Sequence, residues 1–84
     1  MPTAVVRYFA AARAAAGTET EKVQIAEGAT VDDLVVALAA GHGAELARVL
    51  ERCSYLLDEV AVRDRSQTVA DGATLDVLPP FAGG

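Results

Sequence analysis

Residues that could perform catalysis are scarce in this 84-residue chain, which holds one histidine and one cysteine. His42 stands between two glycines, and Cys53 occupies the last position of an apolar stripe with helical spacing. Neither has a partner at the spacing of a nucleophile–base pair or a metal site. We therefore expect a solvent-exposed His42 in a loop. We expect Cys53 to be a buried, unreactive thiol.

Two adjacent carboxylates, Asp32 and Asp33, are the next candidates for acid–base or metal chemistry. Thr30 precedes Asp33 by three residues, which is the spacing of a capping box at a helix start. Acidic residues in the first turn also interact favourably with the helix dipole. Capping therefore explains this pair. The sequence predicts no metal site and no bound cofactor.

The last six residues combine opposite backbone properties at one chain end. Two prolines remove backbone donors and direct the chain stiffly away from the preceding strand. Two glycines without side chains can thread a narrow channel and present the carboxylate of Gly84 there. A flexible end or a cloning remnant would explain a Gly-Gly pair alone but not the complete pattern. We predict a globular domain over residues 1–78 and a protruding flexible tail over 79–84, with the sequence Pro79, Pro80, Phe81, Ala82, Gly83, Gly84.

Composition and charge exclude several classes of protein. The formal net charge of −5 would repel a phosphate backbone, so we expect no nucleic-acid partner. No apolar run approaches the roughly 20 residues that a membrane-spanning helix needs, and the first residues do not resemble a signal peptide. A single cysteine fits a reducing compartment. We predict a cytoplasmic protein of one small domain.

Hydrophobic periodicity predicts the order strand, strand, helix, short strands and closing strand. A helix stripe is formed by Val31, Leu34, Val35 and Leu38, and a second short helix is expected from Ala44 to Cys53. The expected strands are 3–9, 19–26, 55–57, 60–62 and 74–78, with an alanine-rich helical turn over 10–16. With the first and last strands side by side at the centre, this order gives a β-grasp fold, although other small α+β sheets also fit it.

Alternation assigns faces to the two strands expected at the centre of the sheet. Arg7 marks the solvated face of the first strand, where Phe9 also belongs unless it turns into the core. Asp76 marks the solvated face of the last strand, and Leu78 shares that face just before the tail. These outward apolar residues are candidates for a docking surface.

Three segments carry a resemblance to a known family. Residues 6–17 (Val-Arg-Tyr-Phe-Ala, then Ala-Ala-Arg and a glycine), Asp71-Gly72 and the terminal Pro-Pro-Phe-Ala-Gly-Gly resemble the ubiquitin-like sulfur carriers. The sequence is most similar to the MoaD type, the small subunits of molybdopterin synthase. The resemblance implies an α+β, ubiquitin-like β-grasp fold. It has a mixed sheet of four to five strands, one main helix and a short second helix.

The resemblance also implies a chemical role for Gly84. In the family, an adenylating enzyme uses ATP to activate the terminal carboxylate, and sulfur then replaces one oxygen to give a thiocarboxylate. The large synthase subunit, expected in a heterotetramer, uses this sulfur to convert cyclic pyranopterin monophosphate into molybdopterin. The carrier itself catalyses nothing. Phe9, Val62 and Leu78 match positions that contact the large subunit, and Arg13 matches a common basic residue without an assigned role.

Other members of the same superfamily keep two alternatives open. One is a sulfur carrier for thiamine or cysteine synthesis; the extra helix over residues 44–53 argues against the shorter thiamine type. The other is a ubiquitin-like modifier that joins Gly84 to lysines. One departure from many relatives is Asp58-Glu59, where an Asn-Gly type of turn is common.

Overall fold

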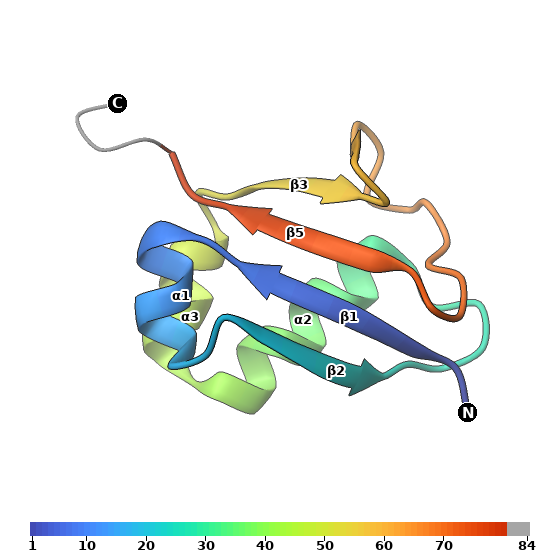
Figure 1. Cartoon of the computed structure of the whole chain (residues 1–84), viewed down its shortest axis with the longest axis horizontal. Helices are drawn as coiled ribbons and strands as arrows, with labels where there is room; N and C mark the ends of the chain where they lie inside the picture. Colours follow the sequence, from blue (N-terminus) through green and yellow to red (C-terminus); the bar gives the residue numbers. More distant parts are fainter. Residues whose placement is uncertain (81–84) are drawn as a thin grey trace.

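The chain forms one sheet and three helices in a computed structural model that describes residues 1–80 (Figure 1). In chain order the elements are β1 (Thr3–Tyr8), α1 (Ala10–Ala16), β2 (Thr20–Gln24), α2 (Val31–His42), α3 (Ala44–Leu50), β3 (Ser54–Leu57), β4 (Val60–Ala61) and β5 (Thr74–Leu78). The predicted elements are present, with ends that differ by at most three residues.

The sheet has the strand order β2-β1-β5-β3-β4. The first and last strands, β1 and β5, pair in parallel at its centre, and every other pair is antiparallel. The helices lie on one side of the sheet (Figure 1), so its other face, called here the outer face, carries no helix of residues 1–80. This topology confirms the predicted β-grasp fold.

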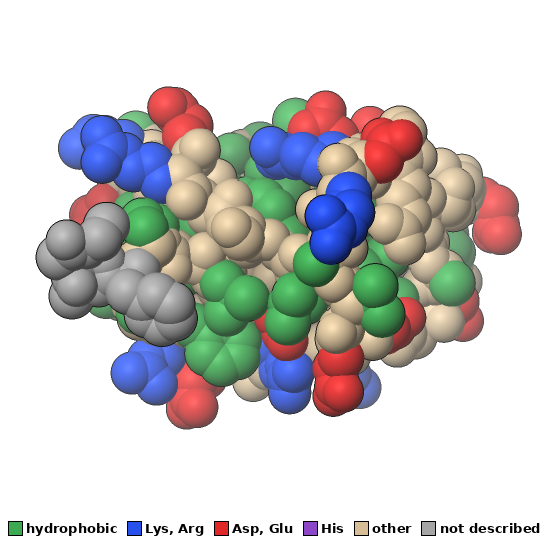
Figure 2. Space-filling model, turned by 90° about the horizontal axis from the view of Figure 1, so that it is seen from above, with side chains coloured by type: hydrophobic (Ala, Val, Ile, Leu, Met, Phe, Trp, Pro, Cys, Tyr) green, Lys and Arg blue, Asp and Glu red, His purple; other side chains and the backbone are tan. Residues whose placement is uncertain are grey.

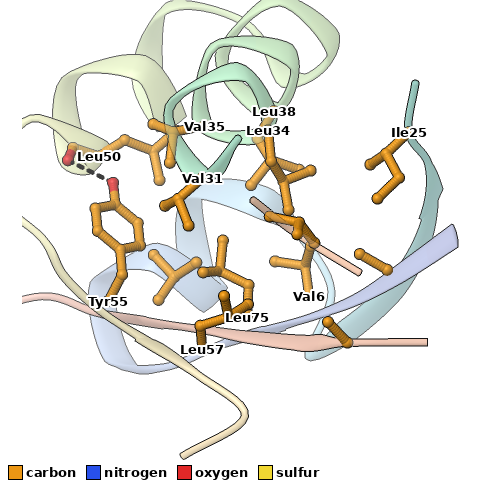
Figure 3. Close-up of a cluster of buried hydrophobic side chains, with 14 of the residues drawn as sticks. Val6, Ile25, Val31, Leu34, Val35, Leu38, Leu50, Tyr55, Leu57 and Leu75 are labelled. Carbon is orange, nitrogen blue, oxygen red and sulfur yellow. Dashed lines mark hydrogen bonds between the residues drawn. The ribbon is translucent and has the colours of Figure 1, made fainter. Parts of the chain in front are cut away.

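The core lies between the sheet and helices α2 and α3 (Figure 3). Val6 and Leu75 from the central strands are fully buried, as is Leu46 of α3. The buried side chains of α2 are the four predicted from helical spacing: Val31, Leu34, Val35 and Leu38. Tyr55 brings a polar group into this core and satisfies it by donating a hydrogen bond to the Leu50 carbonyl at 2.9 Å.

A capping box begins α2, and a glycine ends α1. The hydroxyl of Thr30 accepts a hydrogen bond from the Asp33 amide (3.1 Å), and the Asp33 carboxylate accepts one from the Thr30 amide (3.0 Å). This is the predicted capping box. Gly17 ends α1 with a φ of 77°, a left-handed conformation that favours glycine.

Two predictions about single residues were wrong. His42 lies in the last turn of α2, not in a loop, and is half-buried against the Glu21 carboxylate of β2. Cys53 is half-buried, not fully buried, and its thiol donates a hydrogen bond to the Val49 carbonyl at 3.3 Å. Burial raises the pKa of this thiol, so the reactive thiolate form is disfavoured.

Candidate functional site

The candidate site lies where β5 ends at Leu78 and the chain continues into Pro79 and Pro80. Because β1 and β5 run in parallel, their carboxyl ends meet at the same edge of the sheet. The Phe9 amide, one residue past β1, donates a hydrogen bond to the Val77 carbonyl at 3.2 Å. The predicted tail residues Phe81, Ala82, Gly83 and Gly84 lie outside the described residues.

Phe9 and Leu78 form an apolar surface at this edge, which we call the tail-base patch. Phe9 is 40% exposed and Leu78 is half-buried. The extended backbone of Phe9 keeps it on the outer face, and Ala10 then turns the chain into α1 with a left-handed φ of 50°. Figure 2, which views the molecule from the side of β3, shows hydrophobic side chains gathered around the end of β5. The alternative that Phe9 turns into the core is thus excluded.

The other two predicted interface residues lie elsewhere. Val62 follows β4, donates its amide hydrogen to the Tyr55 carbonyl at 2.9 Å and packs, half-buried, against the core. It therefore lies on the helix side of the sheet, on the face opposite to that of Phe9 and Leu78. Leu56 and Ala61, which pair opposite each other, are the apolar residues of β3 and β4 that point to the outer face. Arg13 lies exposed in α1.

Arg7 and Asp76 form an ion pair across the two central strands. The Arg7 Nε and Nη2 atoms donate to the two carboxylate oxygens of Asp76 at 2.6 and 2.8 Å. Asp76 points to the outer face, as predicted, but Arg7 covers it so well that it is only 4% exposed. The hydrogen bond and the charge of Asp76 raise the pKa of Arg7. Alternation places both residues on the outer face, but only the register between strands brings them opposite each other.

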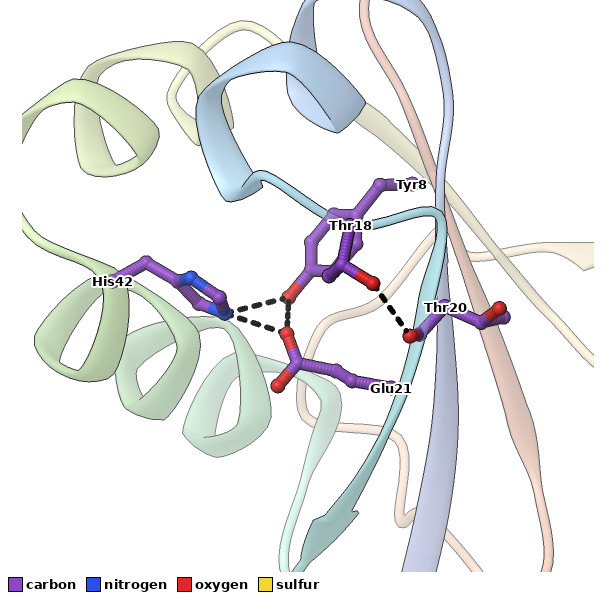
Figure 4. Close-up of polar contacts among 5 residues, drawn as sticks. All are labelled: Tyr8, Thr18, Thr20, Glu21 and His42. Atoms are coloured by element: carbon purple, nitrogen blue, oxygen red, sulfur yellow. Dashed lines mark hydrogen bonds and ion pairs between the residues drawn. The ribbon is translucent and has the colours of Figure 1, made fainter.

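A second polar cluster, formed by Tyr8, Glu21 and His42, lies at the end of β1 next to the candidate site (Figure 4). The Tyr8 hydroxyl donates to Glu21 Oε2 at 2.6 Å, and His42 Nε2 lies 2.5 Å from the same oxygen. These side chains come from β1, β2 and the last turn of α2. They therefore tie the end of β1, immediately before Phe9, to the rest of the domain.

Two tyrosines are expected to make the domain less stable in alkaline solution. Burial first, and then the hydrogen bond and charge of Glu21, raise the pKa of Tyr8; burial raises the pKa of Tyr55 to about 12. Since unfolding restores the ordinary pKa of about 10, this stability is complete below pH 10. It decreases as the pH rises toward the folded-state pKa values. Chemical denaturation of the wild type across pH 9–12 should show a falling free energy of unfolding.

The control for this prediction is the Tyr55→Phe variant. It loses the hydroxyl and with it one titrating group, so its free energy of unfolding should fall less steeply above pH 10. Equal slopes for the two proteins would contradict the assignment of the alkaline transition to Tyr55.

Two kinds of feature are absent from residues 1–80. Among these residues, no group of three or more His, Cys, Asp or Glu side chains could hold a metal ion. None of the helices in the described part of the chain is long and apolar enough to cross a membrane. Within the described range, the arrangement offers an apolar surface patch and an oriented ion pair between the two central strands.

The fold defines a ubiquitin-like β-grasp protein. The model of the ThiS family matches residues 6–84, so the chain belongs to this family of ubiquitin-like sulfur carriers. It is 32% identical over 80 residues to the molybdopterin synthase sulfur carrier subunit of Chlamydomonas reinhardtii, covering 94% of this chain and 95% of that protein.

Solved structures share this fold. The structure of SAMP1 from Haloferax volcanii superposes with a TM-score of 0.85 at 28% identity, covering 98% of this chain and 99% of that one. A complex of subunits 1 and 2 of the molybdopterin-converting factor from Helicobacter pylori contains a chain with the same fold. The TM-score is 0.72 at 21% identity, with 98% of this chain and 99% of that one covered.

Proposed function

We propose that this chain is the sulfur carrier subunit of a molybdopterin synthase and that the carboxylate of Gly84 carries the sulfur. The observation that supports this most directly is the 32% identity to a molybdopterin synthase sulfur carrier subunit along 94% of the chain. The family match also extends through Gly84. The chain is then a sulfur-donating subunit, and catalysis belongs to its partners.

The chemistry requires activation because a carboxylate is a poor electrophile. A partner adenylating enzyme transfers AMP from ATP to the Gly84 carboxylate, which releases pyrophosphate and gives an acyl-adenylate. A protein persulfide attacks the carbonyl carbon, and AMP leaves to give an acyl disulfide. A second thiolate of the sulfur-donating protein then attacks the cysteine sulfur of that acyl disulfide, which releases the Gly84 thiocarboxylate and leaves a disulfide on the donor. The large subunit then receives this group and transfers its sulfur to cyclic pyranopterin monophosphate.

The positions of the end of β5 and of the tail-base patch suit a protein that presents its tail to a partner. Strand β5 leads directly from the centre of the sheet to Pro79, so the domain and the start of the tail have a fixed relative direction. The tail-base patch lies at this exit, where a partner that receives the tail would also contact the domain. The Helicobacter pylori structure, a complex of two subunits of the molybdopterin-converting factor, suggests a large subunit as that partner.

Mass spectrometry of the intact chain tests the proposal. After incubation with ATP, a sulfur donor and a MoaD-activating enzyme, the mass should increase by the difference between one sulfur and one oxygen atom. The increase should disappear when ATP is omitted. A mass that stays unchanged in the complete reaction would refute the sulfur-carrier proposal.

A ubiquitin-like modifier is the second candidate, favoured by the likeness to SAMP1 at a TM-score of 0.85. Activation of Gly84 begins in the same way, but a lysine amine then attacks in place of sulfur. Purification of the tagged chain from its own cells distinguishes the two. Copurification of a synthase large subunit supports the carrier, whereas chains joined to lysines of other proteins support the modifier.

A further inference from the structure

Two arginines line one hollow on the surface, next to the tail-base patch. The hollow is formed by the end of β1, by α1 and by the start of β2, and its lining residues are Arg7, Tyr8, Phe9, Arg13, Glu19 and Thr20. It thus joins a positively charged surface to the exposed ring of Phe9. The Arg7 guanidinium carbon lies 6.0 Å from the centroid of that ring.

Arg7 is held in place but keeps hydrogen-bonding capacity. Asp76 binds Nε and Nη2, and the Arg7 side chain remains 43% exposed. A guanidinium has five N–H donors, so about three are left for another acceptor. Because the bidentate contact already fixes its direction, a further acceptor would cost little additional side-chain entropy.

Arg13 supplies a second guanidinium to the hollow. Within residues 1–80 it forms no ion pair, and it is exposed. Glu19 is the one carboxylate among the described residues that line the hollow, and it pairs there with neither arginine. Among residues 1–80, the hollow is therefore lined by two guanidinium groups that keep N–H donors for a further acceptor.

We propose that this hollow binds a side-chain carboxylate of the protein that receives the tail, and that Arg7 and Arg13 thereby select this partner. The inference rests on the proposed function, since it names the chemistry of the large subunit's docking surface. Around the bound carboxylate, apolar side chains of the partner pack on Phe9 and Leu78. Asp76 orients Arg7 and so acts as a positioning residue.

The energetic reason is the cost of burying unsatisfied donors. A partner that covers the tail-base patch also removes water from Arg7 and Arg13. An apolar partner surface would leave their N–H groups without acceptors, which is costly for charged groups. A carboxylate satisfies them, so the two arginines favour the matching partner and disfavour an apolar one.

Calorimetric titration of the full chain with the synthase large subunit from the same organism tests this inference. Arg13→Gln removes one guanidinium from the surface, and the matched control is Arg48→Gln, an exposed arginine on α3 with the same change in charge. We expect Arg13→Gln to raise Kd about tenfold or more, the usual effect of losing a charge-assisted hydrogen bond. Arg48→Gln should leave Kd within about twofold, as expected for a charge away from the interface.

A second variant tests Arg7 without leaving Asp76 buried and unpaired. Arg7→Leu combined with Asp76→Ala replaces the pair by apolar side chains, and thermal unfolding checks that the fold is kept. It should also raise Kd about tenfold, and the affinity of the wild type should fall with added salt more steeply than that of either variant.

Failure of this inference and failure of the proposed function would give different results. If the wild type binds the large subunit and both variants bind equally well, or if Arg13→Gln behaves like Arg48→Gln, this inference is wrong and the proposed function stands. If the wild type neither binds nor acquires the thiocarboxylate, the proposed function fails and the inference fails with it.

Discussion

Deletion of Gly84 is expected to abolish formation of the thiocarboxylate while leaving the fold intact. The proposed reaction takes place at the terminal carboxylate, and the deleted chain would present the carboxylate of Gly83 one residue short. An extended residue spans about 3.3–3.6 Å, and a displacement of that size removes the reacting atom from a site built for the full length. Mass spectrometry of the intact protein should show loading of the wild type and none of the deletion variant.

Two controls separate loss of chemistry from loss of structure. The midpoint of thermal unfolding should be the same for both proteins, because Gly84 lies six residues beyond the last strand. A chain extended by one alanine after Gly84 should also remain unloaded, since its reacting carboxylate is displaced in the other direction. Normal loading of the shortened chain would show that the carboxylate of Gly84 is not the required group.

The second large effect is expected for Leu75→Ala. Leu75 is fully buried on the core face of β5, where it pairs in register with Val6 of β1 and Leu57 of β3. Removing a leucine side chain from such a site loses transfer free energy and leaves a cavity, which together cost about 3 kcal/mol or more. Chemical denaturation should show this loss. In a small domain it is a large share of the total free energy of unfolding.

Leu56→Ala is the matched control for this core substitution. Leu56 lies on neighbouring strand β3, but it is half-buried on the outer face opposite Asp76. The same truncation there removes less buried area and leaves no enclosed cavity, so a cost of about 1 kcal/mol is expected. If the two variants were equally destabilised, the assignment of the two faces of the sheet would be wrong.

The two faces explain which predictions from sequence succeeded. The alternation of residues in β1 and β5 correctly placed Val6 and Leu75 in the core and Arg7 and Asp76 on the outer face. Because the side-chain period of a strand is two, a few residues suffice to define its faces. Alternation gives the face on which a side chain lies but not how much of it is exposed. Asp76 was therefore expected to be exposed to solvent, although Arg7 covers it.

His42 shows a different limit of the same reasoning. The side chain was assigned to solvent because no partner is near in sequence. Its partner Glu21 is 21 residues away on β2 and becomes a neighbour only when the carboxyl end of α2 packs beside that strand. The position of Val62 on the helix side of the sheet likewise follows from pairing with Tyr55.

The sequence by itself determined the elements, the faces of the central strands, the capping box of α2 and the family to which the chain belongs. These depend on side chains within a few positions of one another, where geometry is set by helix and strand periods. Tertiary structure alone decided the Arg7–Asp76 pair, the Tyr8–Glu21–His42 cluster and the hollow between Arg7 and Arg13. Each of these joins different elements, because strand register and helix packing, rather than sequence spacing, determine which side chains meet.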